Sequence, residues 1–540
     1  MSSIFAAKAA PADDKLRGGY YTPDPLARFV AEWVAAAGAR LLEPSCGDGA
    51  ILKHLAQHGD ATGVELFPEE AHKARAAADA KIVISDFFKW LTPARHGAFD
   101  GVAGNPPFIR FGSWEEQYRA QAFELMREQG LKPTRLTNAW LPFVVASLVA
   151  VRAGGRVGLV LPAELLQVSY AAELRAYLID SCSDITVVSF SELVFPGILQ
   201  EVVLLLAVKG DGPATIRTVE VKNGSHLQDV TVDGAATRAP LHESEKWTKY
   251  FLAPEQIDVL RAVRADPRLA PLRTYATVNV GVVTGRNSFF CLTADRADAL
   301  GIADYTINLL SRSAQLTGTR YTQADLDMQA GQGARTRLLA VPANLDLTTE
   351  PALARYVKLG EDEGVHLGYK CSIRPSWWSV PSISVPNGFM LRQVSTVLRL
   401  TSNKAAATST DTVHRVFTKP GVNMDQLAVA AFNSITLAMS EIMGRSYGGG
   451  LLEIEPSEAV SLPVPDPRLV SSDLIETVDD LLSRGRTDEA LRLVDEEVLI
   501  RGAGFERDEI ARVRLAGTRL RNRRLGRGRK TIVEPELATA

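Results

Sequence analysis

The sequence predicts an α/β protein, with a doubly wound, Rossmann-like sheet in the first 240 residues, then an α+β region and a helical tail. Short β-rich runs alternate with helical patterns as far as about residue 210, which is typical of a mostly parallel sheet covered by helices. The alternation fades from about Glu243, and charged amphipathic helices are predicted over 472–525. These changes predict domains over 1–240, 241–470 and 471–540.

Seven β-rich runs predict the strands of the sheet: 41–44, 61–65, 82–85, 99–104, 156–161, 185–190 and 201–208. Apolar residues at helical spacing predict helices over 24–37 and 49–58, and the first of these has a proline at its start and Gly38 past its end. Only "SELVFPGILQ" separates the last two strands, which is short for a crossover helix, so the final strand is expected to be an antiparallel edge strand.

The second half shows isolated β-like runs at 276–284, 377–385 and 394–400, mixed with helices and glycine turns. Pro463, Pro465 and Pro467 fall at every second position, which disfavours a helix and predicts an extended linker.

Composition excludes several classes of protein. The 540 residues are 46% hydrophobic and 23% charged with a net charge of −3, which is an ordinary globular balance without a general bias toward polyanions. The basic residues are concentrated locally, because 511–530 holds nine Arg or Lys and no acid. We expect this segment to contact phosphates or to extend into solvent.

The four cysteines, Cys46, Cys182, Cys291 and Cys371, have neither disulfide-framework nor metal-ligand spacing, which favours a reducing compartment and no bound metal. The N-terminus lacks a signal-peptide core, and the longest apolar stretch, Ala139 to Val151, is too short to span a bilayer. The prediction is a cytoplasmic protein that is not inserted in a membrane.

Three predicted strands end in polar residues suited to a nucleotide-like ligand. The first ends in "LLEPSCGDGAIL", where Gly47 and Gly49 allow close backbone approach, although Leu52 breaks the full dinucleotide fingerprint. Glu65 follows Glu43 by about 20 residues, the spacing of an acid that binds ribose hydroxyls. The alternatives are a tight turn and a solvated acid.

The third strand ends in "SDFF", where Asp86 could accept from an adenine amino group and Phe87 could lie against its ring. The alternative is that Asp86 only caps a helix.

The fourth strand ends in "FDGVAGNPPFIR", where prolines stop the ladder. The Asn105 side-chain oxygen and the Pro106 carbonyl are two acceptors on a rigid corner, and Phe108 offers a stacking face. An adenine amino group is a poor nucleophile because its lone pair is delocalised, and preorganised acceptors on both N–H groups would counter this. Attack on a sulfonium methyl needs no titratable base. The alternative is a plain loop corner.

Taken in order, "GGYYTPDPLARFV", "LLEPSCGDGAIL", "TGVEL", "ISDFFKW" and "FDGVAGNPPFI" resemble the gamma-class adenine-N6 DNA methyltransferases of TaqI type and Eco57I type. The resemblance is clear over residues 15 to about 240 and weaker to about 465. It implies a seven-stranded methyltransferase sheet that binds S-adenosylmethionine, followed by a target-recognition domain that binds duplex DNA.

The resemblance also implies residue roles. The implied cofactor-binding residues are Tyr21, Thr22, Glu43, Ser45, Gly47, Glu65, Asp86, Phe87, Asn105 and Pro107. The implied catalytic corner is Asn105, Pro106, Pro107 and Phe108. Phe108 stands where the family usually has Tyr; it keeps the stacking face, so activity is expected to survive. The segment "SELVFPG" is similar to a later family motif and places Phe195 on the other side of a flipped-out adenine.

In the C-terminal half, "VGVVTGRNSFF" places Arg286 and Asn287 in a glycine turn, and these residue types read guanine and adenine. "RPSWWSVP" and "GRSYGGGLLEIEP" also resemble family segments. The expected DNA contacts are Arg286, Asn287, Lys404, Arg415 and Tyr447. Trp377 and Trp378 are expected in a core more often than at DNA.

The function predicted is site-specific transfer of a methyl group to adenine N6 in duplex DNA. Two alternatives stay open, an RNA adenine-N6 methyltransferase and a modification subunit that needs a specificity partner. We expect modification without cleavage, because few residues precede the first methyltransferase motif and no nuclease constellation follows. A separately encoded restriction endonuclease is an expected companion, and a recognition region of this size favours a monomer.

Overall fold

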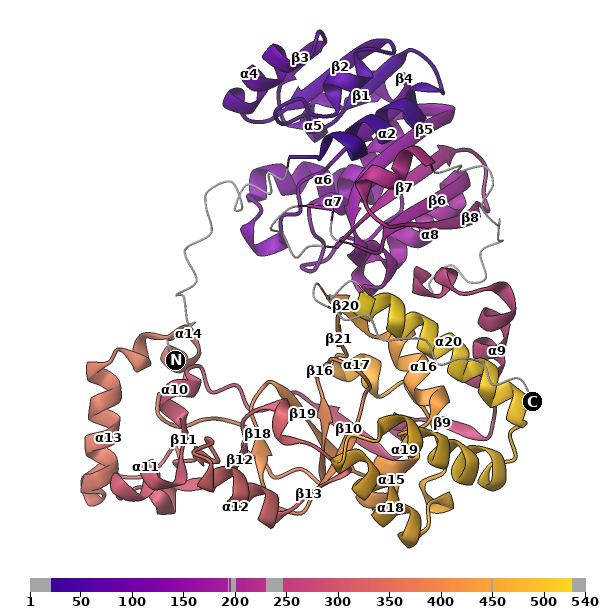
Figure 1. The fold of residues 1–540 in the computed structure, drawn as a ribbon. Coiled ribbons are helices and arrows are strands. Elements are labelled where there is room, and N and C mark those ends of the chain that lie inside the picture. The colour runs from indigo at the N-terminus through magenta and orange to yellow at the C-terminus, as the bar shows by residue number, and fades with distance from the viewer. Residues whose placement is uncertain (1–20, 193, 196–200, 230–245, 448–449, 527–540) are drawn as a thin grey trace. The chain divides into compact units, whose positions relative to one another are not determined.

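The computed structural model describes residues 21–192, 194–195, 201–229, 246–447 and 450–526. The chain divides into two compact units (Figure 1). Unit 1 comprises Met1–Phe251, Tyr447–Gly449 and Gly526–Ala540, and unit 2 comprises Leu252–Ser446 and Gly450–Leu525. Residues on both sides of 470 thus belong to unit 2, and the three predicted domains stay a prediction.

Unit 1 is built on an eight-stranded sheet with helices between most of its strands. The strands are β1 (Arg40–Glu43), β2 (Asp60–Glu65), β3 (Lys81–Ile84), β4 (Phe99–Gly104), β5 (Val151–Pro162), β6 (Cys182–Phe190), β7 (Val202–Lys209) and β8 (Thr215–Val221). The helices are α2 (Asp24–Ala35), α3 (Leu52–Leu55), α4 (Pro68–Ala77), α5 (Phe87–Trp90), α6 (Glu116–Glu128), α7 (Trp140–Ala150) and α8 (Ala172–Ser181).

The strand order β3-β2-β1-β4-β5-β7-β6-β8 confirms the predicted doubly wound sheet. β1 pairs in parallel with β2 and β4, so the chain starts in the middle of the sheet and winds outward in both directions. All seven predicted strands are present. The 49–58 helix is shorter than expected, because only α3 is helical there.

The far side of the sheet differs from the prediction in two ways. β7 is antiparallel as predicted, but it lies between β5 and β6 rather than at the edge. Its residues Val202–Ala207 are all buried, and a strand without a polar face is stable only inside a sheet. The edge belongs to an eighth strand, β8, which pairs in parallel with β6 and whose "TIRTVEV" mixes polar with apolar side chains.

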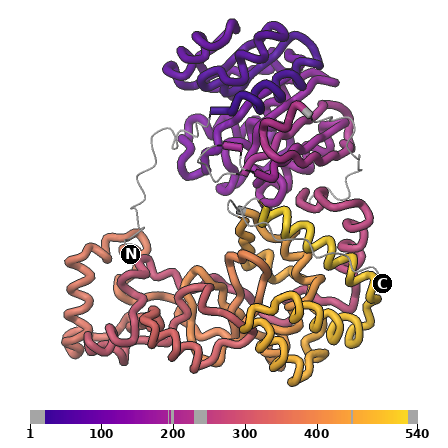
Figure 2. Tube along the Cα trace, viewed as in Figure 1, coloured from indigo at the N-terminus to yellow at the C-terminus, as the bar shows by residue number. Residues whose placement is uncertain are grey.

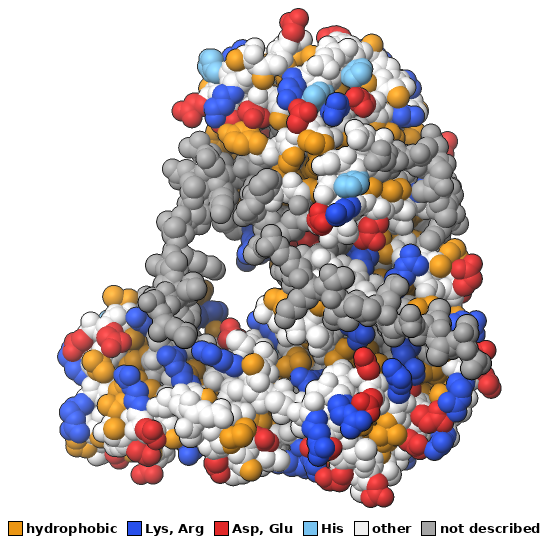
Figure 3. All heavy atoms as spheres, viewed as in Figure 1, with side chains coloured by type: hydrophobic (Ala, Val, Ile, Leu, Met, Phe, Trp, Pro, Cys, Tyr) orange, Lys and Arg blue, Asp and Glu red, His pale blue; other side chains and the backbone are white. Residues whose placement is uncertain are grey.

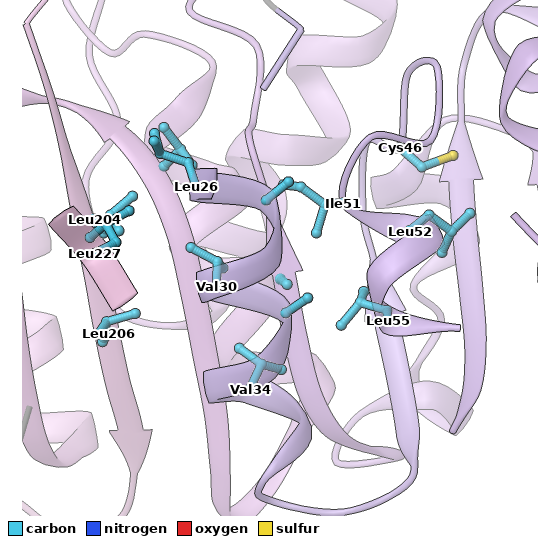
Figure 4. Packing of buried hydrophobic residues seen from close by; sticks show 14 of the residues in the cluster. Leu26, Val30, Val34, Cys46, Ile51, Leu52, Leu55, Leu204, Leu206 and Leu227 are labelled. Carbon is cyan, nitrogen blue, oxygen red and sulfur yellow. The ribbon is translucent and has the colours of Figure 1, made fainter. Parts of the chain in front are cut away.

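One hydrophobic cluster fixes α2 and α3 to one face of this sheet (Figure 4). Leu26, Val30 and Val34 of α2 point toward the strands beside Leu204 and Leu206. The helix lies close to β4 and β5 because both carry glycine beneath it. A Cβ at Gly101 would come within 2.3 Å of Val34 Cγ1, and one at Gly158 within 2.8 Å of Val30 Cγ1.

On the opposite face α7 is buried at every position, packed among β4, β5, α6 and α8. It coincides with the apolar stretch noted in the sequence. Within the part of the chain that the structure describes, no single helix has the length and apolarity to cross a membrane. The bent pair Met424–Ala430 and Ser434–Met443 reaches that threshold only on combined length and composition.

Unit 2 combines small sheets with helices. Its strands are β9 (Leu269–Pro271), β10 (Ala276–Asn279), β11 (Cys291–Leu292), β12 (Thr306–Leu310), β13 (Arg320–Tyr321), β14 (Arg337–Leu339), β15 (Gly388–Leu391), β16 (Gln393–Val394), β17 (Leu400–Asn403), β18 (Thr408–Ser409), β19 (Val413–Thr418), β20 (Arg445–Tyr447), β21 (Leu451–Glu453) and β22 (Pro463–Pro465). They include a five-stranded sheet, β10-β19-β15-β17-β13, and a four-stranded sheet, β11-β14-β12-β18.

The helices of unit 2 are α9 (Pro254–Ala265), α10 (Asn287–Phe290), α11 (Ala294–Ala299), α12 (Gln323–Gly331), α13 (Pro351–Asp362), α14 (Tyr369–Ser372), α15 (Met424–Ala430), α16 (Ser434–Met443), α17 (Pro456–Ala459), α18 (Ser472–Ser483), α19 (Thr487–Val494) and α20 (Arg507–Gly526). The last three, with a π-helix over Asp495–Gly502, confirm the predicted helical C-terminal region.

Two predictions for unit 2 are wrong. The β-like run 377–385 contains no strand and instead forms turns that carry Trp377 into the core. The proline-spaced segment is the buried strand β22, which pairs with β9, rather than a linker. Prolines at every second position place the nitrogens that lack hydrogen on one edge, and the other edge remains able to pair.

The basic C-terminal segment is partly structural, which differs from the expected phosphate contacts. Arg524 near the end of α20 is only 3% exposed, and its Nη2 pairs with Oε1 of Glu441 in α16 at 2.7 Å. The backbone of α20 runs beside that of α16 (Figure 2). Arg524 also donates to the carbonyls of Ser395, Thr396 and Gly450. Arg514 likewise pairs with the buried Asp495 at 2.7 Å.

We predict that Arg524→Ala lowers the free energy of unfolding of the full chain by about 3–5 kcal/mol, because it leaves the Glu441 carboxylate buried without its partner. Urea unfolding followed by circular dichroism measures the change. Arg519→Ala, on an exposed position of the same helix, is the matched control and should change stability by less than about 0.5 kcal/mol. Equal effects of the two variants would contradict this role of Arg524.

Candidate active site

A cavity of about 260 Å³ lies in unit 1, beyond the C-terminal ends of β1 to β4. In an open α/β sheet this edge is where ligands bind. All ten predicted cofactor-binding residues are among its lining: Tyr21, Thr22, Glu43, Ser45, Gly47, Glu65, Asp86, Phe87, Asn105 and Pro107. The structure therefore brings these residues together, and the role of each stays a prediction.

The turn after β1 forms the floor of the cavity. Gly47 and Gly49 both have positive φ, at 49° and 86°, which side chains rarely tolerate. A Cβ at Gly49 would lie 3.0 Å from the Ala74 Cα, so α4 also needs glycine there. The Cys46 N–H donates to the Val64 carbonyl at 3.1 Å, which ties this turn to β2.

Glu65, at the end of β2, connects two strand ends. Its Oε2 accepts from the Gly47 N–H and its Oε1 from the Phe67 N–H, both at 2.9 Å. These two bonds orient the carboxylate while each oxygen keeps a lone pair for a further donor.

Four acids of the lining have raised pKa values, and burial is the largest cause for each. They are Glu43, Asp48, Glu65 and Asp86. The pKa of Glu43 is raised furthest, because its carboxyl is fully buried and Asp48 and Glu65 repel its charge. Its Oε2 has no hydrogen-bond partner among the described residues. The site is thus prepared for a ligand that brings positive charge and N–H or O–H donors.

Asp86 serves both interpretations that the sequence left open. It caps α5 by accepting from the Lys89 N–H at 2.9 Å, and it also lines the cavity. Phe87 is buried and stacks on Phe143 of α7, with ring centroids 5.6 Å apart and planes 15° apart. The rim here is therefore rigid and aromatic.

The Asn105 corner opens into the same cavity. β4 ends at Gly104, as the two prolines predicted, and Pro107 lines the cavity. The Asn105 Nδ2 donates to Oγ1 of the buried Thr22 at 3.1 Å, which fixes the amide orientation and makes Oδ1 its acceptor end. Ser45 Oγ donates to the Asn105 carbonyl at 3.5 Å.

The two predicted stacking rings do not line the cavity. Phe108 is partly buried against the α2–α3 cluster, and Phe195 belongs to that cluster with 5% exposure. Pro106, two residues before Phe108, is also buried. Both rings thus share one apolar environment next to the corner, and their stacking on a base stays a prediction.

Sequence reasoning missed part of the lining: Asp48, Phe67, Glu70, Trp114, Tyr118 and Phe143. Phe67 and Glu70 belong to "VELFPEE", so their distance from Glu65 was the available signal. At the rim, Tyr21 donates its hydroxyl to Glu70 at 3.4 Å, and Lys73 donates to Glu70 at 2.7 Å. Phe143 lies in a helix whose only polar side chain is Ser147, and this helix carries no sequence signal of a site.

In unit 2 the predicted DNA contacts divide. Arg286 and Asn287 are exposed at the start of α10, and Lys404 is half-exposed and pairs with Asp425 at 2.7 Å. Arg415 is buried, and its guanidinium donates to the Val280 and Ser382 carbonyls.

The Arg415 guanidinium therefore has a structural role inside the unit, and its expected phosphate contact stays a prediction. Tyr447 lies in β20, but its side chain is outside the described residues. Trp377 is buried among aromatic rings, as the core interpretation held.

Residues 3–230 match the family N-6 DNA Methylase, and residues 244–499 match Type II methyltransferase M.Eco57I, C-terminal domain. The type II methyltransferase M.AccI of Acinetobacter calcoaceticus is 21% identical over 471 residues, 81% of this chain and 83% of that protein. M.XamI of Xanthomonas campestris pv. amaranthicola is 23% identical over 470 residues, 83% and 85% of the two chains.

The chain is also similar to the structure of the type IIL restriction-modification enzyme MmeI in complex with DNA. The match covers 92% of this chain and 74% of the MmeI chain, with a TM-score of 0.57 and 11% sequence identity, and it shows a similar fold. The chain belongs to the N6-adenine DNA methyltransferases, with a methylase domain followed by the C-terminal domain of the M.Eco57I type. The resemblance inferred from the motifs is thereby confirmed.

We predict that Glu43→Gln raises the thermal stability of the ligand-free protein at neutral pH. The pKa of Glu43 is higher in the folded state than in the unfolded state. The stability of the wild type therefore falls as the pH rises from the unfolded pKa through the folded pKa. The amide removes that loss, so the difference in Tm between variant and wild type should grow with pH. Melting curves between pH 5 and pH 8 measure it. A variant less stable than wild type throughout would contradict the assignment.

Proposed function

We propose that this protein transfers a methyl group from S-adenosylmethionine to N6 of an adenine extruded from duplex DNA, at a specific site. The observation that carries this is the position of the Asn105 amide. It opens into the cavity that the strand-end acids line, and the buried Thr22 holds its acceptor oxygen in one orientation. The Asn105 acceptor and the proposed cofactor site therefore lie in the same cavity.

The lining fits S-adenosylmethionine in chemistry. Glu43 offers an unpartnered buried oxygen near the amino-acid end, Glu65 offers lone pairs to ribose hydroxyls, and Asp86 faces the adenine end. Phe143 and Phe67 add apolar surface for a base. When bound, the cofactor supplies a methyl group on a sulfonium, which is electrophilic without further activation.

Catalysis in this proposal rests on acceptors rather than on a nucleophilic side chain. Asn105 Oδ1 and the Pro106 carbonyl accept from the two N–H groups of adenine, which draws the nitrogen lone pair out of conjugation. The lining contains Cys46, but burial raises the pKa of its thiol and keeps it neutral. A covalent thiolate mechanism is therefore disfavoured.

The target base is proposed to leave the duplex and stack between Phe108 and Phe195, since a base inside the helix cannot reach the corner. Unit 2 is proposed to bind the duplex and select the site. The order of motifs, with the cofactor residues before Asn105 and the recognition region C-terminal, supports the gamma class. We propose a cytoplasmic monomer that acts on DNA alongside a separately encoded restriction endonuclease.

We predict that Asn105→Ala lowers the methylation rate of duplex DNA at least about 100-fold, the usual effect of removing one preorganised polar group at a reacting centre. S-adenosylmethionine affinity should fall far less than the rate, because the other predicted cofactor-binding residues remain in place. Tritiated methyl transfer measures the rate, and calorimetry measures the affinity. Asn223→Ala, outside the cavity lining, is the control and should retain wild-type turnover. Full activity in Asn105→Ala would refute the catalytic assignment.

We further predict that affinity for S-adenosylmethionine increases with pH and then levels off. The pKa values of Glu43, Glu65 and Asp86 are raised in the free site, and a bound cation lowers them, so binding releases protons over the pH range in which these groups titrate. Calorimetry in buffers of different ionisation enthalpy detects the released protons. S-adenosylhomocysteine lacks the sulfonium charge and should show a weaker dependence. An affinity that falls as pH rises would contradict this.

A further inference from the structure

Two segments of unit 2 form one continuous surface, although the sequence treats them separately. They are 281–290, which contains "VTGRNSFF", and 364–378, which ends in "RPSWW". Arg374 Nη2 donates to the Val283 carbonyl at 3.0 Å and to the Thr284 carbonyl at 2.8 Å. A Cβ at Gly285 would lie 3.0 Å from the Lys370 Cβ, so the glycine turn lies directly against α14.

The inner side of this surface is a packed aromatic core. Phe289 stacks on Tyr356 with centroids 4.6 Å apart, and it also contacts Trp377 at 5.4 Å. The Tyr356 hydroxyl donates to the Phe289 carbonyl at 2.8 Å. These contacts fix both segments in position before any partner arrives.

The outer side exposes large apolar side chains close together. Leu367 and Tyr369 are each 73% exposed and Ile373 is 60% exposed, all within seven residues of chain. Single exposed apolar residues are ordinary, whereas a group of them marks a binding surface. Figure 3 shows basic and apolar side chains next to one another on the visible left-hand part of unit 2.

The charge of this surface has one sign. The segments 281–290 and 364–378 contain Arg286, Lys370 and Arg374 and no Asp or Glu. The acids that precede 364–378 are Glu361 and Asp362, which pair with Lys358 at 3.5 and 3.2 Å, and the exposed Glu363. Arg286 is exposed, and its guanidinium donates to the backbone carbonyl of Glu363 at 3.2 Å.

We propose that this surface, here called the α14 surface, enters a groove of the duplex DNA. The α14 surface consists of Arg286, Asn287, Leu367, Tyr369, Lys370 and Ile373. The apolar side chains contact base edges or wedge between base steps, as apolar residues do in other DNA complexes, and the cations contact phosphates or guanine. Arg374 is a positioning residue that holds the glycine turn on α14. This inference rests on the proposed function and adds residues that determine specificity.

Duplex DNA is favoured over a protein partner because the two segments carry cations and no acid, and they combine these cations with exposed apolar side chains. An interface between copies of the chain would bring these like charges face to face. That alternative is an outcome of the test below.

The test uses the full chain with Leu367→Ser, Tyr369→Ser and Ile373→Ser combined. We expect its affinity for a cognate duplex, measured by fluorescence anisotropy, to fall at least about tenfold, given that one base–aromatic contact is worth ~1–3 kcal/mol. Affinity for S-adenosylmethionine and the melting temperature should stay at wild-type values. Met328→Ser and Leu515→Ser, also exposed apolar positions of unit 2, are the controls and should bind DNA normally.

A second readout concerns specificity. Methylome sequencing of cells expressing Arg286→Ala should show relaxed preference at one position of the methylated motif, which a structural defect would not produce. The inference is overturned if the triple variant binds DNA like wild type, or if the wild type is a dimer that the triple variant dissociates while DNA binding is unchanged. In either case the proposed function is retained if the wild type still methylates duplex DNA. If the wild type is inactive, both the proposed function and this inference are overturned.

Discussion

The site depends on one electrostatic constraint: four carboxyl groups are held at one end of a sheet, two of them buried and two partly buried. Burial raises the pKa of Glu43, Asp48, Glu65 and Asp86, so each charge is unfavourable in the free protein. Backbone N–H groups offset part of this, and the turn that supplies them needs glycine at two positive-φ positions. The close packing of α2 on glycine-bearing strands then holds the turn in place. A positively charged ligand stabilises the charged form of these acids. The same acids that favour ligand binding therefore lower the stability of the ligand-free protein.

Buried and partly buried arginines organise unit 2 in a comparable way. Arg524, Arg415 and Arg374 each donate to backbone carbonyls of segments distant in sequence, and these carbonyls end strands or form turns. The guanidinium group suits this task because its several donors point in fixed directions. These three arginines therefore build the framework of the unit, and exposed cations such as Arg286 and Lys370 are the ones proposed to contact DNA.

The sequence predicted the sheet of unit 1 well, because hydrophobic periodicity and strand-end motifs are local properties. It also predicted the lining through Glu43, Glu65, Asp86 and Asn105, since parallel strands bring their ends together. It failed where the outcome depends on distant partners. The position of β7 follows from which strands flank it, and the burial of Arg415 and Arg524 follows from carbonyls far away in the chain. Phe143 was missed for the same reason, because its helix shows only that it is apolar.

The central claim is that this chain alone methylates adenine N6 at a defined DNA sequence. Long-read sequencing of genomic DNA from a methylation-free host that expresses the chain tests it most directly. The account predicts N6-methyladenine at one motif throughout the genome, absent from cells that express Asn105→Ala. An unmodified genome in cells with abundant folded protein would contradict the account and would indicate an RNA acceptor or a missing specificity partner.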